Sequence, residues 1–158
     1  MICITGTSGF LGKHILEHLA SLDIPILSLS RTKIITKHAN IRWKYFNLED
    51  DSYDENLLEG CTHLIHMAGA IKGRAEKIRK VNFYGTKKIV HLAETHKVEK
   101  VIFVSSIDAI LFENPYSKSK VDSERELRKS KLSWVIVRPS VMFGKGDTKN
   151  FFILNKIV

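Results

Sequence analysis

Cysteine is scarce in this chain of 158 residues, which contains only Cys3 and Cys61 and no CxxC spacing. Two such thiols exclude a disulfide scaffold and a cysteine-based zinc site, and they suit a reducing compartment. No apolar run approaches the roughly 18 residues of a transmembrane helix. The first residues, MICITGTSG, contain no basic leader. We therefore expect a cytoplasmic protein with no membrane partner.

The composition is that of an ordinary folded domain, with 44% hydrophobic and 27% charged residues, so disorder is a poor description. The length fits a single domain covering residues 1–158. A domain of this size buries roughly 70% of the surface of its unfolded chain, so it needs neither disulfides nor a metal to hold a core.

The charge is unbalanced, with 25 Lys and Arg against 17 Asp and Glu and a net charge of +8. Such a charge can favour binding to nucleic acid, to an acidic membrane surface or to an anionic small molecule. The basic residues are scattered at helix-like spacing among glutamates, which favours solvated helix faces. No nucleic-acid motif or aromatic-interleaved basic stripe occurs, so we expect no nucleic-acid partner. The phosphates of a bound dinucleotide are an alternative use for some of this charge.

Short runs rich in β-branched residues alternate with segments of helical periodicity. Runs such as VIFVSS and WVIVR are apolar without alternation, which is typical of parallel strands covered on both faces. We expect strands over residues 2–5, 26–30, 42–46, 63–66, 100–105 and 133–138, and helices over 10–22, 74–97 and 116–130. This order predicts an α/β fold, a Rossmann-type doubly wound parallel sheet with helices on both faces.

The last nine residues, NFFILNKIV, form an apolar end to the chain. So much apolar surface indicates either a segment that packs against the sheet or a partner, or a chain cut short.

The first expected strand runs directly into GTSGFLG at residues 6–12, where a helix is expected to begin. A side chain at Gly6 or Gly9 would block a pyrophosphate from the amides at the helix N-terminus, where the helix dipole favours negative charge. Gly12 would let the helix pack closely on the strand. A plain turn with a helix cap is the alternative, but the position between strand and helix favours a dinucleotide site.

The second expected strand ends in Ser30 and Arg31, and no acid occurs in residues 26–33. A carboxylate at this place would bind the 2′-hydroxyl of NAD. A cation beside a small hydroxyl suits a 2′-phosphate instead. We therefore expect NADP(H) as the favoured cofactor, with NAD(H) as the other candidate and a simple surface arginine as the alternative.

Tyr116 and Lys120 are four residues apart, which places them on one face of a helix. A free phenol has a pKa of about 10. The Lys120 ammonium is expected to lower the pKa of Tyr116, so that the phenol can exchange a proton with a carbinol oxygen. Ser105 and Ser106 lie at the carboxyl end of a strand, where open α/β sheets bind ligands, and a hydroxyl there can orient the substrate oxygen.

A zinc-protease spacing, HxxEH, occurs at His14, Glu17 and His18. It could place two imidazoles on one helix face. The glycine loop already accounts for this helix, however, and no third ligand is evident. We expect no metal site.

Seven segments together resemble the extended or atypical short-chain dehydrogenases/reductases, the NAD(P)-dependent epimerase/dehydratase family. They occur in the order of that family and extend over essentially the whole chain: GTSGFLG (6–12), NL (47–48), LIHMAGA (64–70), VNFYGT (81–86), VSS (104–106), YSKSK (116–120) and VRPSVMFGKGD (137–147).

The resemblance implies a role for each matching residue. Tyr116 would be the acid/base, Lys120 its partner, Ser106 the active-site hydroxyl and Asn82 a mid-helix residue near the active site. Together with Arg31, the expected cofactor-binding residues are Gly6, Ser8, Gly9, Phe10, Leu11, Asn47, Leu48, Met67, Ala68, Gly69, Ser105, Tyr116, Lys120 and Pro139.

Three departures from the family pattern bear on function. Ile107 and Asp108 stand where dehydratases carry an Asp-Glu pair, which disfavours sugar dehydration. The segment from Ser106 to Tyr116 is shorter than in most epimerases and resembles members that act as reductases or only bind cofactor. Family members also continue well past this length, so we expect the C-terminal substrate lobe to be absent or truncated.

The resemblance implies an NAD(P)-dependent oxidoreductase or epimerase acting on a secondary alcohol or carbonyl, with nucleotide sugars among the candidate substrates. Hydride would move between nicotinamide and the substrate carbon while Tyr116 handles the oxygen proton. A non-catalytic dinucleotide-binding module or regulatory subunit is the alternative. A homodimer through the helices expected over 74–97 and 116–130 is a further candidate.

Overall fold

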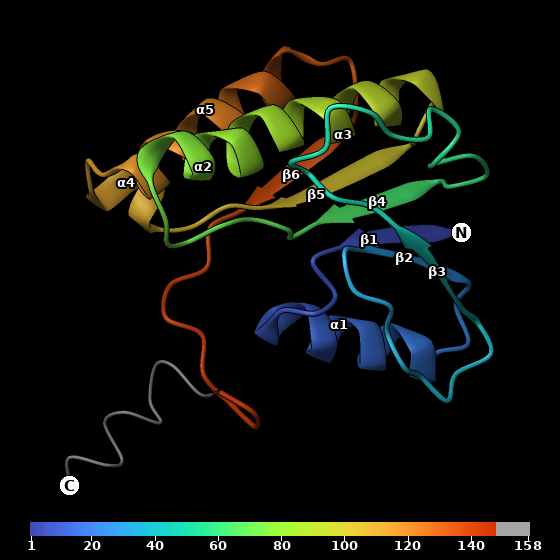
Figure 1. The fold of residues 1–158 in the computed structure, drawn as a ribbon. Helices are drawn as coiled ribbons and strands as arrows, with labels where there is room; N and C mark the ends of the chain where they lie inside the picture. The colour runs from blue at the N-terminus through green and yellow to red at the C-terminus, as the bar shows by residue number, and fades with distance from the viewer. Residues whose placement is uncertain (148–158) are drawn as a thin grey trace, which may run out of the picture.

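In the computed structural model, residues 1–147 are described, and within them six strands form one parallel sheet (Figure 1). The order across the sheet is β3-β2-β1-β4-β5-β6. Strands β1 to β3 therefore follow one another toward one edge of the sheet, and strands β4 to β6 follow one another toward the opposite edge. This is the arrangement predicted for a doubly wound sheet. The strands are β1 (Ile2–Thr5), β2 (Ile26–Ser30), β3 (Ile41–Tyr45), β4 (His63–His66), β5 (Lys100–Val104) and β6 (Trp134–Val137).

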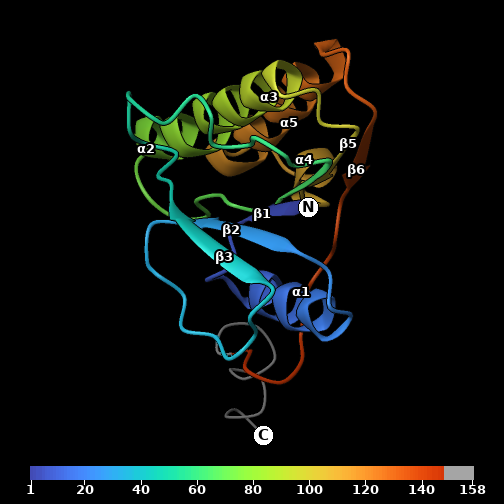
Figure 2. The ribbon, with the colours of Figure 1, turned by 90° about the vertical axis from the view of Figure 1, so that its right-hand side faces the viewer.

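Helices lie on both faces of the sheet, which confirms the predicted fold class (Figure 2). One face carries α1 (Phe10–Ser21), and the other carries α2 (Ala75–Arg79), η1 (Lys80–Tyr84), α3 (Gly85–Thr95), α4 (Asp108–Leu111) and α5 (Pro115–Lys129). None of the helices within residues 1–147 has the length and hydrophobicity of a transmembrane segment.

The core consists of two apolar clusters, one on each face of the sheet. The larger cluster includes Ile89 of α3, Phe103 of β5 and Leu127 of α5. The smaller one joins Ile4 of β1 to Leu16 of α1. Because side chains alternate across a strand, neighbouring residues of one buried strand serve both clusters, which is why the strand runs are apolar without alternation.

The single helix expected over residues 74–97 is divided by the π-helical turn η1 between α2 and α3. In this turn the main-chain oxygen of Asn82 accepts a hydrogen bond from the Ser123 hydroxyl at 3.0 Å. Hydrophobic periodicity does not register a turn widened by one residue, so the sequence did not predict it. The short helix α4 was not predicted either.

The expectation that β6 is covered on both faces was wrong. Trp134 and Ile136 pack against the larger cluster, whereas Val135 and Val137 are 42% and 43% exposed. β6 is one of the two edge strands, and within residues 1–147 no helix covers its second face. The apolar segment NFFILNKIV, for which a packing role was considered, lies outside the described residues.

Candidate active site

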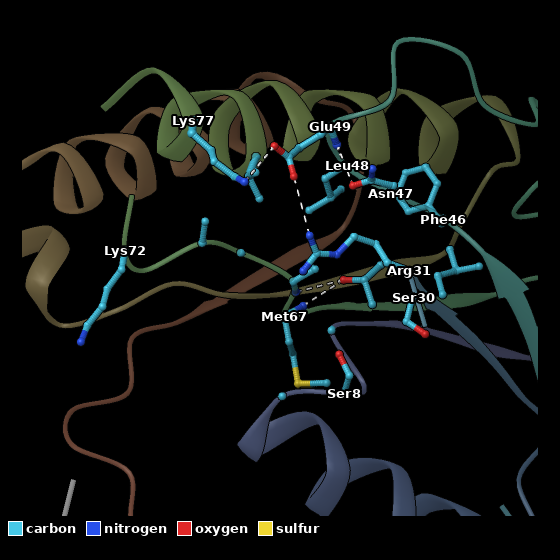
Figure 3. Close-up of a pocket in the computed structure, with 18 residues that line it drawn as sticks. Ser8, Ser30, Arg31, Phe46, Asn47, Leu48, Glu49, Met67, Lys72 and Lys77 are labelled. Carbon is cyan, nitrogen blue, oxygen red and sulfur yellow. Dashed lines mark hydrogen bonds and ion pairs between the residues drawn. The ribbon is translucent and has the colours of Figure 1, made fainter. Parts of the chain in front are cut away.

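Two neighbouring clefts open at the carboxyl ends of the strands, where β1 and β4 lead the chain in opposite directions. The first cleft, of about 350 Å³, lies against the residues that follow β2 and β3 (Figure 3). The second cleft, of about 810 Å³, extends from α1 to the start of α5. Both are lined by the glycine loop and the segment after β4, namely Gly6, Ser8, Gly9, Met67 and Gly69. The two clefts therefore lie on either side of one loop.

The protein itself requires glycine at two positions of this loop. Gly6 has a φ of +79°, and a Cβ there would lie 2.6 Å from the Ala68 nitrogen. A Cβ at Gly12 would lie 2.1 Å from the Gly6 oxygen. This second contact shows that α1 packs closely on the loop directly after β1, at Gly6 and Thr7, rather than on the strand itself.

Gly9 differs from these two glycines, because an added Cβ would meet only the Gly6 oxygen, at 3.3 Å. Gly9 is the N-cap of α1, and no side chain caps this helix start. Phe10 and Leu11, in the first turn, line the second cleft, and no side-chain oxygen competes for their amides. Such a helix start binds an anion.

Arg31 directly follows β2 and lines the first cleft, as expected for a residue that reads the cofactor ribose. Its guanidinium, however, lies 3.7 Å from a carboxylate oxygen of Glu49. The other Glu49 oxygen lies 3.7 Å from the Lys77 ammonium. Glu49, Lys72 and Lys77 also line this cleft and were not predicted as site residues. The only available signal for Glu49 was its position directly after the NL motif.

Asn47 and Leu48 form the wall of the first cleft opposite the glycine loop. The Asn47 amide donates to Asp50 at 2.6 Å, and its oxygen accepts from the Glu49 main chain at 3.2 Å. Leu48 packs so closely on Gly85 that a Cβ there would lie 2.7 Å from the Leu48 Cβ. The Asn47 side chain therefore shapes the turn that carries this wall.

Thr5 ties the ends of β1 and β4 together. Its hydroxyl oxygen accepts from the amides of Met67 and Ala68, each at 3.2 Å, and is 2.7 Å from Nδ1 of His66. These bonds hold the segment after β4 against the glycine loop.

His66 is a buried, neutral link between this junction and α3. Its Nε2 lies 3.0 Å from the Thr86 hydroxyl, and its ring stacks on Phe103. Burial first, and the Lys120 charge second, lower the pKa of His66 to about 3. A protonated ring would carry an uncompensated charge in the core.

Tyr116 lies in the first turn of α5 because Asn114 caps that helix and Pro115 follows the cap. The Asn114 side-chain oxygen accepts from the Ser117 amide at 2.9 Å. Burial raises the pKa of Tyr116, a hydrogen bond with Ser106 lowers it, and the Asp108 charge raises it, so the net shift is upward. The Ser106 hydroxyl thus lies beside Tyr116, although Ser106 is not among the described residues that line the second cleft.

The predicted effect of Lys120 on Tyr116 is corrected by the structure. The Lys120 side chain is buried and extends to β5, where its ammonium donates to the Val104 carbonyl at 2.7 Å and lies 4.2 Å from the Phe103 ring centre. Burial lowers the pKa of Lys120 to about 7, against an opposing effect of Glu124. Burial, and not the neighbouring ammonium, therefore dominates the pKa of Tyr116.

Glu124 is a buried carboxylate one turn beyond Lys120. It accepts from the Ser105 hydroxyl at 2.6 Å and from Nε of Arg138 at 2.8 Å, with a second contact to the Arg138 guanidinium. Burial raises the pKa of Glu124, but the hydrogen bonds from Arg138 and Ser105 outweigh it and hold the pKa below its usual range. The alternating charges of this stretch of α5 favour a solvated face, so the sequence does not predict a buried carboxylate at Glu124.

Asn82 and Pro139 lie behind the second cleft and are not among the described residues that line it. The Asn82 oxygen accepts from the Ala70 amide at 2.7 Å, and its nitrogen donates to the Ala70 carbonyl at 2.9 Å and to the Ser119 hydroxyl at 2.8 Å. The Pro139 carbonyl accepts from the Ile107 amide at 3.0 Å. Asn82 thus holds the chain at Ala70, and Pro139 holds the chain at Ile107.

The HxxEH motif does not gather ligands in the described structure. His14 donates through Nε2 to the Lys145 carbonyl at 2.9 Å and packs edge-on against Phe10. Within residues 1–147, no group of three His, Cys, Asp or Glu side chains could hold a metal ion. His14 instead attaches the loop around Gly146 to the start of α1, at the edge of the second cleft.

We expect Glu124→Gln to destabilise the fold by about 2–4 kcal/mol. The change removes the buried negative charge that pairs with the Arg138 guanidinium. Urea unfolding monitored by circular dichroism measures the change. The matched control is Glu126→Gln, whose carboxylate lies 3.9 Å from Lys129 at the surface, and which should cost less than about 0.5 kcal/mol. Equal costs for the two variants would contradict the role of the buried carboxylate.

Stability should fall as the pH drops from 6.5 toward 3. In this window the unfolded chain protonates His66 while the folded protein does not, since its pKa is lowered from 6.5 to about 3. The free energy of unfolding should therefore lose up to about 1.4 kcal/mol per pH unit from this group alone. Urea unfolding between pH 7 and 4 should show a shallower slope for His66→Gln and an unchanged slope for the exposed control His91→Gln. A slope in His66→Gln as steep as that of the wild type would refute the assignment.

Comparisons with known proteins agree with this geometry. The chain is 29% identical to the ceramide reductase of Caulobacter vibrioides, over 94% of this chain and 48% of that protein. It is 24% identical to the UDP-glucose 4-epimerase of Vibrio cholerae, over 99% of this chain and 56% of that protein. The chain thus spans about half the length of these relatives.

A similar fold occurs in the crystal structure of the Bordetella bronchiseptica enzyme WbmH in complex with NAD+. The TM-score is 0.86 at 19% identity, over 98% of this chain and 61% of that one. The sequence of residues 3–134 matches the 3-beta hydroxysteroid dehydrogenase/isomerase family. The predicted resemblance to NAD(P)-dependent short-chain dehydrogenases and epimerases is confirmed, and the chain belongs to the 3-beta hydroxysteroid dehydrogenase/isomerase family.

Proposed function

We propose that this protein binds a nicotinamide dinucleotide across the two clefts and acts as an oxidoreductase or epimerase on a secondary alcohol or carbonyl compound. The observation that carries the proposal is the uncapped start of α1 between two clefts, with Ser105 and Tyr116 lining the second. One cleft alone would fit many small ligands, whereas two clefts joined at an anion site fit a dinucleotide.

The residues present fit such a cofactor. The amides at Phe10 and Leu11 would hold the pyrophosphate, and the bare Gly9 leaves room for its approach. The adenosine half would lie in the first cleft between Arg31 and Leu48. The nicotinamide half would lie in the second cleft, which extends past Ser105 to Tyr116 and Lys120.

The chemistry divides between cofactor and protein. When bound, the nicotinamide supplies hydride transfer. The Tyr116 phenol would donate or accept the proton at the substrate oxygen, with the Ser106 hydroxyl hydrogen-bonded to it. Glu124 holds Ser105, and Asn82 holds the chain at Ala70, so both act as positioning residues.

NADP(H) is the proposed preferred form, with NAD(H) as the alternative. Three cationic side chains, Arg31, Lys72 and Lys77, line the first cleft together with the single carboxylate of Glu49. This excess of positive charge favours a ribose that carries a 2′-phosphate.

A non-catalytic dinucleotide-binding module is the second candidate. Two observations favour it: the Lys120 ammonium is bonded to the Val104 carbonyl, and burial raises the pKa of Tyr116. Both disfavour the ionised form of the Tyr116 phenol at neutral pH. The turnover experiment below separates the two candidates.

The proposed assembly and location rest on fewer observations. α3 and α5 lie side by side on the same face of the sheet, which makes them candidates for a homodimer contact (Figure 1). Cys3 and Cys61 are buried and free, which suits the reducing cytoplasm.

Dinucleotide binding should depend on the bare backbone at Gly9. We expect Gly9→Val to raise the Kd for NADPH at least about 10-fold, because the side chain occupies the space in front of the α1 amides. Isothermal titration calorimetry measures the affinity, and thermal unfolding should show a folded variant. Ala39→Val, in an exposed loop outside both clefts, should bind like the wild type. If Gly9→Val binds equally well, the anion site lies elsewhere.

Turnover should depend on Tyr116. With a panel of carbonyl substrates, we expect Tyr116→Phe to oxidise NADPH at least about 100-fold more slowly than the wild type while binding it with similar affinity. Absorbance at the nicotinamide band follows the reaction. Tyr45→Phe, at an exposed tyrosine bonded to Asp50, serves as the control and should be unaffected. If the wild type and Tyr116→Phe are equally inert, the enzyme proposal fails and the binding-module candidate stands.

A further inference from the structure

We propose that Glu49 weakens the preference of the first cleft for NADP(H), because its carboxylate competes with a ribose 2′-phosphate for Arg31 and Lys77. The inference rests on the proposed dinucleotide function and makes that function more specific. Glu49 would act as an internal anion that occupies the site of the 2′-phosphate. NADP(H) must displace it, whereas NAD(H), which lacks this phosphate, need not.

Glu49 lies between two cations that come from distant segments (Figure 3). One carboxylate oxygen faces the Arg31 guanidinium and the other faces the Lys77 ammonium, each at 3.7 Å. The Glu49 side chain is 26% exposed, against 67% for Arg31 and 58% for Lys77. The Glu49 carboxylate is therefore the least exposed of the three charged groups. Arg31 and Lys77, the two more exposed groups, each contact one of its oxygens.

The backbone keeps this carboxylate in place. The Glu49 amide donates to the side-chain oxygen of Asn47, and the side-chain nitrogen of Asn47 donates to Asp50. The turn that forms the cleft wall thus aims Glu49 at the end of β2. Displacement of Glu49 by a ligand would involve its side chain alone and leave the wall intact.

The ion pairs have the geometry of contacts that a ligand can exchange. A separation of 3.7 Å exceeds hydrogen-bond distance, so neither cation is tightly bound to Glu49. A phosphate monoester carries a charge of about −1.5 to −2 and three acceptor oxygens, and it therefore binds Arg and Lys more strongly than one carboxylate does.

The effect on the two cofactors should differ in size. The 2′-phosphate of NADP(H) would bind beside Arg31, at the end of β2, where it meets repulsion from the Glu49 charge. The corresponding ribose of NAD(H) is uncharged at that position, so the Glu49 charge affects it little. Glu49 thus narrows the advantage for NADP(H) that Arg31, Lys72 and Lys77 create.

The experiment compares the wild type, Glu49→Gln and Asp51→Asn by isothermal titration calorimetry. Asp51 is the matched control, because it lies in the same segment and pairs with Lys80 at 3.5 Å, yet its side chain is 88% exposed and it does not line the first cleft. The ligands are NADPH, NADH, adenosine 2′,5′-bisphosphate and 5′-AMP. The last two test the first cleft without the nicotinamide half.

We expect Glu49→Gln to bind NADPH and the bisphosphate roughly 5- to 20-fold more tightly than the wild type, as loss of one like charge a few ångströms from the phosphate predicts. NADH and 5′-AMP should change by less than about twofold. Asp51→Asn should change the affinity for all four ligands by less than about twofold.

Three results would overturn the inference while sparing the proposed function. These are an unchanged affinity of Glu49→Gln for NADPH, an equal gain in Asp51→Asn, and weaker NADH binding by Glu49→Gln, which would make Glu49 a ligand of the ribose hydroxyl. If neither dinucleotide binds to the wild type or to either variant, the proposed function itself fails and the inference fails with it.

Discussion

The close approach of two backbones, after β1 and after β4, determines where the crevice lies. Gly6 passes so near Ala68 that no Cβ fits between them, and the Thr5 hydroxyl bonds to the amides of Met67 and Ala68. Because β1 and β4 lead outward in opposite directions, their junction leaves space on both sides. The two clefts occupy that space, and the start of α1 lies between them.

The fold was largely predictable from the sequence, because it depends on local patterns. Buried strand runs bounded by glycine or polar residues gave β1, β2 and β4 their observed limits. The features that escaped prediction arise from contacts between distant residues. The π-helical turn at Asn82 bonds to Ser123 of α5, and no periodicity within a single segment reveals such a bond.

The candidate site was predicted in its residues more than in its electrostatics. The glycine loop and Arg31 line the first cleft, and Tyr116 lines the second. The position of the Lys120 ammonium could not be predicted, because this long side chain can reach either Tyr116 or the sheet. In the structure the ammonium is bonded to the Val104 carbonyl. Sequence spacing limits which residues share a helix face, but burial and partners from other segments decide their pKa values.

We propose that a nicotinamide dinucleotide spans the two clefts with its pyrophosphate on the start of α1. A crystal structure of the protein at saturating NADPH is the decisive test of this placement. We expect pyrophosphate oxygens within hydrogen-bond distance of the amides at Phe10 and Leu11 and a nicotinamide ring beside Tyr116. Cofactor bound at any other place, or a crevice filled by the protein's own side chains at saturation, would contradict it.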